Sequence, residues 1–103
     1  MGAGRDAAEL TAYRIVQEAL TNTLRHAAAR HAWVTISYDE PEVRIRVADD
    51  GIPDGPGSPG HGIDGMRERA ALHHGALYAG PAEDGGWLVE AILRPAAMTA
   101  VPV

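Results

Sequence analysis

The sequence predicts an α/β two-layer sandwich, in which two helices cover one face of a mixed, mostly antiparallel sheet. Three observations support this class. One long segment repeats apolar residues at helical spacing, two pairs of short segments alternate as strands do, and a shorter helical segment lies between the pairs. The order helix, two strands, loop, helix, two strands lets both hairpins join one sheet, with the helices on one side.

Composition restricts the kind of protein. The length of 103 residues suits one domain, which we expect over residues 10–94, between a flexible N-terminus (1–9) and a flexible tail (95–103). The lack of cysteine excludes a thiolate metal site. No apolar run approaches the roughly 20 residues of a membrane span, and scattered arginines with a net charge of −5 argue against nucleic-acid binding. We expect a cytoplasmic domain without membrane contact; anchoring of a parent protein stays open.

The first half of the chain predicts a helix and a hairpin. The helix spans residues 10–28, and its apolar residues recur at intervals of three and four, which predicts a buried face of Tyr13, Val16, Leu20, Leu24 and Ala27. Two alternating strands follow at 33–38 and 43–48, joined by a short acidic turn. Their apolar faces are Val34, Ile36 and Tyr38 in the first strand and Val43, Ile45 and Val47 in the second.

The second half begins with a loop that holds five glycines and three prolines between Gly51 and Gly62, a composition that propagates neither helix nor strand. A helix is predicted from Asp64, as its N-cap, to about residue 74, with Gly75 as the C-terminal cap. Its inward residues are predicted to be Met66, Ala70 and Leu72 or His73. A second strand pair covers 77–80 and 87–93, with an apolar face of Trp87, Val89, Ala91 and Leu93.

Glu18, Asn22 and His26 follow one another at intervals of four on the first helix, so they share one face, with Arg25 beside them. A solvated polar face is the ordinary explanation for such a stripe. The functional alternative is a Mg2+ site, in which Asn22 offers a hard oxygen to an ion that keeps waters and phosphate oxygens as its other ligands. Glu18 would then orient or deprotonate an incoming group.

Asp49 and Asp50 end the second strand directly before Gly51, and alternation buries only one of the two carboxylates. A buried carboxylate is costly unless it is hydrogen-bonded. An acceptor at this place suits the exocyclic amine of adenine, which guanine replaces with a carbonyl. An Asx-turn to the following glycine is the structural alternative.

Glycines also flank the expected start of the second helix, at Gly60, Gly62 and Gly65. They let backbone N–H groups approach a ligand closely, and the N-terminus of a helix attracts anions such as a triphosphate. The loop is not a Walker A motif, because the chain contains no lysine.

Residues 13–22 (YRIVQEALTN) resemble the N box of histidine kinases, particularly the subfamily that pairs with NarL/LuxR-type response regulators. Asp49-Asp50-Gly51 resembles the G1 box and residues 60–69 the G2 box. The resemblance covers about residues 10–93 and implies the Bergerat (GHKL) fold with ATP and Mg2+. It makes Glu18 the acid/base or water-positioning residue, with a contact to the ion through a water, Asn22 the Mg2+ ligand and Asp49 the adenine contact. The other nucleotide-binding positions that it implies are Arg25, His26, Gly51, Gly60, His61, Gly62, Ile63, Gly65 and Met66.

The chain departs from the family pattern at two places. Pro53 stands where the G1 box usually has a second glycine, and none of the five histidines precedes an acidic residue, as the phosphoacceptor of such kinases does. The resemblance therefore implies the ATP-binding half of a sensor histidine kinase. It implies two partners, the helical dimerisation domain with the acceptor histidine and, through the full kinase, a response regulator. We expect a monomer that binds ATP without autophosphorylating.

Two other functions remain open at this point. A protein-serine kinase of the anti-sigma-factor type shares the fold superfamily and works without an attached acceptor helix. A degenerate module is the non-enzymatic alternative, in which Pro53 has spoiled the loop and only the fold persists.

Overall fold

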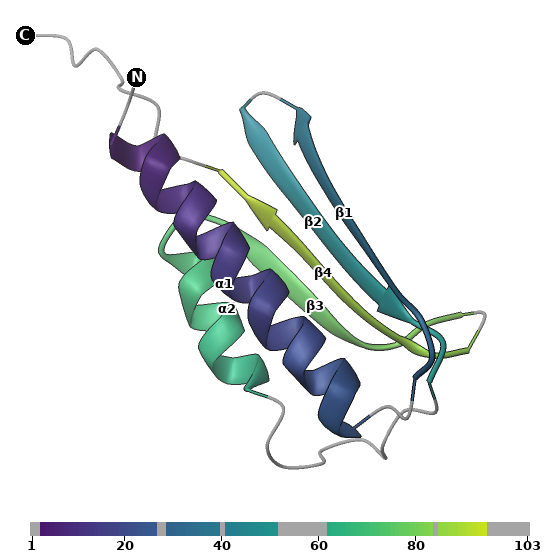
Figure 1. Cartoon of the computed structure of the whole chain (residues 1–103). Helices are drawn as coiled ribbons and strands as arrows, with labels where there is room; N and C mark the ends of the chain where they lie inside the picture. Colours follow the sequence, from purple (N-terminus) through teal and green to yellow (C-terminus); the bar gives the residue numbers. More distant parts are fainter. Residues whose placement is uncertain (1–2, 27–28, 40, 52–61, 84, 95–103) are drawn as a thin grey trace, which may run out of the picture.

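The computed structural model describes residues 3–26, 29–39, 41–51, 62–83 and 85–94. Its elements are α1 (Ala3–His26), β1 (Ala32–Asp39), β2 (Glu42–Asp49), α2 (Ile63–Ala71), β3 (Ala76–Pro81) and β4 (Trp87–Leu93). The strands form one sheet in the order β1-β2-β4-β3, and α1 and α2 lie side by side on one face of it (Figure 1). This confirms the two-layer sandwich. The sheet was predicted as mixed and mostly antiparallel, and every described pairing is antiparallel.

The core lies between the helices and the inner strands. Alternate residues of β2 and β4 are buried, which confirms the inward faces predicted for both strands: Val43, Ile45 and Val47, and Val89, Ala91 and Leu93. From α2, Met66 and Ala70 are buried as predicted. Of the two alternatives for the next inward residue, His73 is half-buried and Leu72 is 76% exposed. No helix within the described residues combines the length and apolarity that a membrane span requires.

The buried face of α1 differs from the predicted one. It consists of Ala8, Ala12, Ile15 and Ala19, while Tyr13 is 60% and Leu24 86% exposed. Val16 and Leu20 pack against the core only in part. Alanines let the helix lie close to the sheet, whereas the periodicity of the large apolar residues indicated a neighbouring stripe. Ala27 lies outside the described residues.

The bounds of α1 also correct the prediction. The helix begins at Ala3, so most of the N-terminus that was predicted to be flexible forms its first turns. It ends at His26, and the predicted end at Ala28 lies outside the described residues, as does the tail at 95–103.

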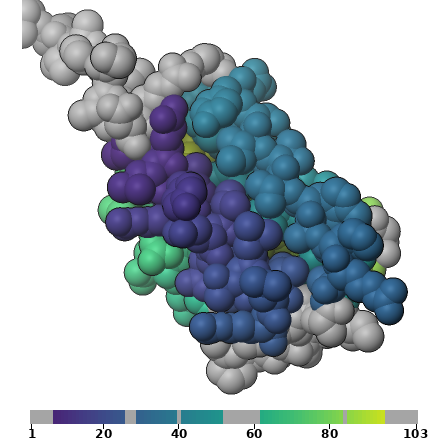
Figure 2. All heavy atoms as spheres, viewed as in Figure 1, coloured from purple at the N-terminus to yellow at the C-terminus, as the bar shows by residue number. Residues whose placement is uncertain are grey.

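β1 is an edge strand, and all eight of its residues are exposed. Its register places Val34 opposite Val47 and Ile36 opposite Ile45, so the predicted alternation is correct. The helices lie over β2, β4 and β3 more than over β1 (Figure 1). In the space-filling view, β1 forms the surface beside α1 (Figure 2).

Both ends of α2 differ from the prediction. Its N-cap is Gly62, with φ of 63°, and Asp64 lies in the first turn instead. At the other end, His74 rather than Gly75 adopts the positive φ, at 55°. Gly75 is required for another reason, because a Cβ there would overlap the carbonyl oxygen of Ile92. The hydroxyl of Thr11 is hydrogen-bonded to His73 Nε2 at 2.9 Å, which joins this end of α2 to α1.

Candidate functional site

The C-terminal end of β2 holds a buried carboxylate. Asp49 is 4% exposed. Its Oδ2 accepts a hydrogen bond from the hydroxyl of Thr23 on α1 at 3.0 Å, and its Oδ1 accepts the N–H groups of Gly51 at 2.9 Å and Trp87 at 3.3 Å. Three segments therefore hold this side chain in place. Because a carboxylate has about four acceptor positions, these bonds leave capacity for a ligand.

The hydrogen bond from the Gly51 N–H to Asp49 forms an Asx-turn. This turn was the alternative to a ligand-binding role for Asp49. It explains only one of the contacts. The bonds from Thr23 and Trp87 tie helix α1 and strand β4 to the same carboxylate, which a local turn does not require. The expectation that one aspartate of the pair is buried is confirmed, since Asp50 is exposed.

Gly85 and Gly86, in the turn before β4, form a matched pair for testing the packing around Asp49. Both have positive φ, 91° and 81°. A Cβ on Gly86 would overlap the backbone oxygen of Asp49, while one on Gly85 would meet no atom of the described residues within 4 Å. We expect Gly85→Ala to lower the free energy of unfolding by about 1 kcal/mol and Gly86→Ala by roughly 2 to 4 kcal/mol, because overpacking adds to the same backbone cost. Urea unfolding measures both, and equal losses would contradict the overlap.

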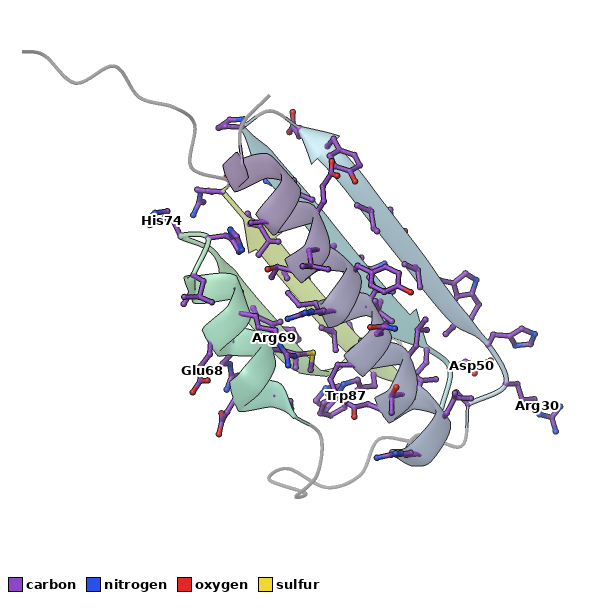
Figure 3. The ribbon with its side chains drawn as sticks, turned by 60° about the vertical axis from the view of Figure 1, so that its left-hand side comes forward. Arg30, Asp50, Glu68, Arg69, His74 and Trp87 are labelled. Atoms are coloured by element: carbon purple, nitrogen blue, oxygen red, sulfur yellow. The ribbon has the colours of Figure 1, made fainter. Side chains whose placement is uncertain are left out.

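Asp50 has a structural role that sequence reasoning missed. Its Oδ1 accepts the backbone N–H groups of Arg30 and His31, both at 2.9 Å, and its Oδ2 lies 2.9 Å from His31 Nδ1. The His31 ring stacks on Trp33, with centroids 5.9 Å apart. Asp50 thus fastens the segment that leads into β1 to the end of β2 (Figure 3). The two hydrogen bonds from His31, backbone first and ring second, lower the pKa of Asp50 to about 2.

This lowered pKa predicts a pH-dependent contribution to stability. Asp50 has a usual pKa of 3.8 and a folded value of about 2, so folding favours its ionised form. The contribution is complete above about pH 3.8 and is lost as the pH falls through about 2. Asp50→Asn should therefore reduce the acid-induced loss of unfolding free energy over this range, measured by urea unfolding at each pH. The control is Asp64→Asn, because the side chain of Asp64 is 98% exposed. The same reduction in both variants would contradict the assignment of this pH dependence to Asp50.

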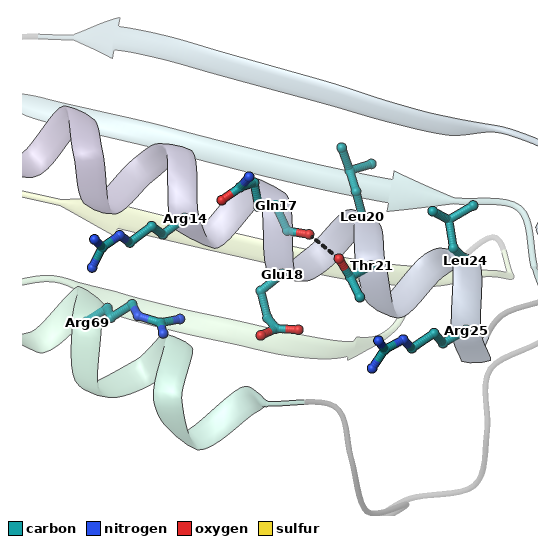
Figure 4. Close-up of a pocket in the computed structure, with 8 residues that line it drawn as sticks. All are labelled: Arg14, Gln17, Glu18, Leu20, Thr21, Leu24, Arg25 and Arg69. Carbon is teal, nitrogen blue, oxygen red and sulfur yellow. Dashed lines mark hydrogen bonds between the residues drawn. The ribbon is translucent and has the colours of Figure 1, made fainter.

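A second group of candidate residues lies between the two helices. A hollow of about 660 Å3 is lined by seven residues of α1 and by Arg69 of α2. Arg14, Glu18 and Arg25 project from α1 on the side of α2, and Arg69 reaches back towards Glu18 (Figure 4). The remaining lining residues are Gln17, Leu20, Thr21 and Leu24.

Glu18 lies against the start of α2. A Cβ on Gly62 would lie 3.2 Å from Cδ of Glu18, tighter than most Cβ contacts. The positive φ of Gly62 adds a second reason for glycine at this position. The structure therefore brings together two candidate residues that lie 44 positions apart in the sequence, 62 minus 18.

Asp49 and Gly51 line a different hollow, of about 500 Å3, beyond the end of β2. Its other walls are Trp33, Arg46, Ala48, Asp50, Ala82, Gly85 and Gly86. The candidate residues thus do not all line one cavity in the described part of the chain. Helix α1 connects the two groups, because Glu18 lines the first hollow while Thr23, five residues further on, is bonded to Asp49.

A model of the histidine kinase-, DNA gyrase B- and HSP90-like ATPases matches residues 7–97. The chain belongs to this ATPase family. Among solved structures, the ATPase domain is similar to the blue-light activated histidine kinase of Erythrobacter litoralis EL346, with a TM-score of 0.60 and 26% identity, over 78% of this chain and 28% of that one.

Curated relatives of the ATPase domain are sensor histidine kinases. It is 42% identical over 80 residues to YxjM of Bacillus subtilis (strain 168), covering 78% of this chain and 20% of that protein. It is 40% identical over 80 residues to DesK of the same organism, covering 75% and 21%. The chain therefore spans about a fifth of the length of these relatives, and what it shares with them is their ATP-binding catalytic domain. The predicted family and fold are confirmed.

The other predicted site residues of the ATPase domain differ in how deeply they are buried. Asn22 is 3% exposed and lies one turn after Glu18, beside Thr23. Gly65 is half-buried, and Ile63 packs partly against the core. Met66 is fully buried in the core, and its N–H is bonded to the Gly62 oxygen. We therefore assign Met66 to packing rather than to nucleotide contact. Gly60, His61, Pro53 and the side chain of His26 lie outside the described residues.

Proposed function

We propose that the chain is the Mg2+-ATP-binding catalytic domain of a sensor histidine kinase, which supplies the γ-phosphoryl group for phosphorylation of a histidine in two-component signalling. The observation that carries this proposal is the setting of Asp49. Its carboxylate is buried, held by three donors and bonded through Thr23 to the helix that carries Glu18 and Asn22. A fixed acceptor of this kind favours the amine of adenine over the carbonyl of guanine.

The other candidate residues lie at the hollow between the two helices and at the start of α2. The N-terminus of α2, capped by Gly62, presents backbone N–H groups to the phosphates. Arg25 supplies positive charge at the same hollow as Glu18. Glu18 acts as the acid/base or water-positioning residue, and the close approach of Gly62 orients its carboxylate.

The side chains of this region also fit Mg2+. Asn22 and Glu18, one turn apart on α1, offer hard oxygen donors, and Mg2+ takes few protein ligands because waters and phosphate oxygens fill most of its octahedron. Asn22 is the direct ligand in this proposal, and Glu18 reaches the ion through a water. When bound with the nucleotide, the ion neutralises charge on the β- and γ-phosphates.

The phosphoryl acceptor comes from another segment or another protein. No histidine of the chain precedes an acidic residue, and the chain spans about a fifth of its curated relatives. We propose that the acceptor is a histidine on the dimerisation helix of a parent kinase, that a response regulator receives the phosphoryl group, and that the domain works in the cytoplasm. The similarity to sensor histidine kinases favours a histidine over a serine acceptor.

Asn22→Ala tests the Mg2+ part of the proposal. The wild-type chain should bind a non-hydrolysable ATP analogue about tenfold more tightly with Mg2+ than with a chelator, and Asn22→Ala should bind equally under both conditions. Asn22→Asp is the matched control, because it keeps a hard oxygen and should keep the Mg2+ dependence. A folded Asn22→Ala chain that retains the full Mg2+ effect would exclude Asn22 as the ligand, and failure of the wild type to bind at all would overturn the proposed function.

A further inference from the structure

We propose that Arg14 and Arg69 bind the γ-phosphate of the nucleotide and thereby make the domain prefer ATP to ADP. The inference rests on the proposed function and adds to it two residues for which the sequence indicated no role. Arg14 lies one turn before Glu18 on α1, and Arg69 comes from α2 on the opposite wall of the hollow. In Figure 4, the side chains of Arg14 and Arg69 lie on one side of Glu18, and Arg25 lies on the other side.

The charges of this hollow are not used by the fold. Within the described residues, neither Glu18 nor any of the three arginines that line the hollow with it makes an ion pair or a hydrogen bond through its side chain. Other arginines of the domain do form ion pairs with nearby carboxylates: Arg44, Arg46, Arg67 and Arg94. Three positive charges around one negative charge leave a positive excess, and mutual repulsion of the guanidinium groups is relieved by an anion with more than one charge.

The position of Arg14 on α1 indicates which phosphate of the nucleotide the two arginines contact. Asp49, the proposed adenine contact, is bonded to Thr23. Nine residues separate position 23 from position 14, a rise of about 14 Å and about two and a half helical turns, so Arg14 lies on the side of α1 that faces α2, and Glu18 lies between the two positions. A nucleotide with its base at Asp49 and its phosphates extended around α1, past Glu18 and towards α2, therefore brings its terminal phosphate to Arg14 and Arg69. Arg25 follows Thr23 by two residues and lies nearer the base.

Guanidinium groups suit this task, because they donate paired, charge-assisted hydrogen bonds to phosphate oxygens. ATP has a γ-phosphate and ADP does not, so contacts from Arg14 and Arg69 to this group add to the affinity for ATP and leave that for ADP unchanged. Loss of these contacts after phosphoryl transfer favours replacement of ADP by ATP.

The test compares two affinities of the intact 103-residue chain. Isothermal titration with MgADP and with a β,γ-imido analogue of MgATP gives the preference for the triphosphate in the wild type and in Arg14→Gln, Arg69→Gln and Arg67→Gln. We expect each of the first two substitutions to lower the preference about tenfold, or about 1.4 kcal/mol, with the MgADP affinity unchanged. Arg67→Gln removes the same charge from α2 outside the hollow and should leave the preference unchanged, and Arg69→Lys should retain part of it.

The outcomes separate this inference from the proposed function. An unchanged preference in Arg14→Gln and Arg69→Gln, with MgADP still bound, overturns the γ-phosphate assignment and leaves the proposed function intact. Equal losses of both affinities also overturn it, because the arginines would then act on a part that the two nucleotides share. Failure of the wild-type chain to bind either nucleotide overturns the proposed function, and the inference with it.

Discussion

Asp49→Asn is expected to lower the affinity of the chain for MgATP about a hundredfold, or about 2.8 kcal/mol. This loss lies in the upper range for a hydrogen bond to a charged group. The substitution keeps the shape of the side chain but turns one acceptor oxygen into a donor. Thr23, Gly51 and Trp87 already donate hydrogen bonds to this side chain. The single amide oxygen of asparagine would accept some of these bonds, so little acceptor capacity would remain for the amine of adenine. Titration of the chain with a non-hydrolysable MgATP analogue measures the effect.

Two control variants separate binding from folding at this position. Thr23→Val removes one hydrogen bond to Asp49 and keeps its carboxylate, so it should lower stability and leave most of the nucleotide affinity. Asp50→Asn removes the neighbouring carboxylate, whose hydrogen bonds go to Arg30 and His31, and should leave adenine binding unchanged. If Asp50→Asn lost as much affinity as Asp49→Asn, the adenine contact would be wrongly assigned.

Glu18→Gln is expected to slow phosphoryl transfer to a supplied histidine-bearing acceptor domain by about 10² to 10⁴. The amide keeps the size of the side chain beside Gly62 but neither takes up nor releases a proton in the reaction. Affinity for MgATP should change little, since Glu18 does not contact the base and the amide oxygen of glutamine keeps an acceptor for the water that reaches the ion. Formation of acid-labile phosphohistidine on the acceptor measures the rate.

Gln17→Ala is the matched control, because Gln17 lines the same hollow as Glu18. This variant should transfer the phosphoryl group at close to the wild-type rate. Transfer by Glu18→Gln at the wild-type rate would show that Glu18 only neighbours the phosphates. An equal fall in affinity and rate would instead assign Glu18 to nucleotide binding.

Most of the fold was predictable because alternation and turn residues act locally. Val43, Ile45 and Val47 face the core as their spacing indicates. The stripe on α1 was wrong because small residues decide it: Ala8, Ala12 and Ala19 pack against the sheet, while the larger Tyr13 and Leu24 stay exposed. The N-cap of α2 was also wrong, because Asp64 satisfies a local capping rule but the helix begins after Gly62, whose positive φ glycine adopts at little cost.

The candidate site was predictable where one residue type carries the chemistry. Asp49 is buried at the strand end as alternation required. Contacts between distant segments were not predictable in the same way. The clamp from Asp50 to Arg30 and His31 depends on the path of the chain between α1 and β1. The position of Arg69 beside Glu18 depends on how α2 packs against α1, and no local spacing encodes that packing.

The central claim is tested most directly by isothermal titration of the folded chain with non-hydrolysable analogues of ATP and GTP in the presence of Mg2+. The account predicts saturable binding of one ATP analogue per chain and binding of the GTP analogue weaker by about tenfold or more. A well-folded sample that binds neither nucleotide, or binds both equally, would contradict it.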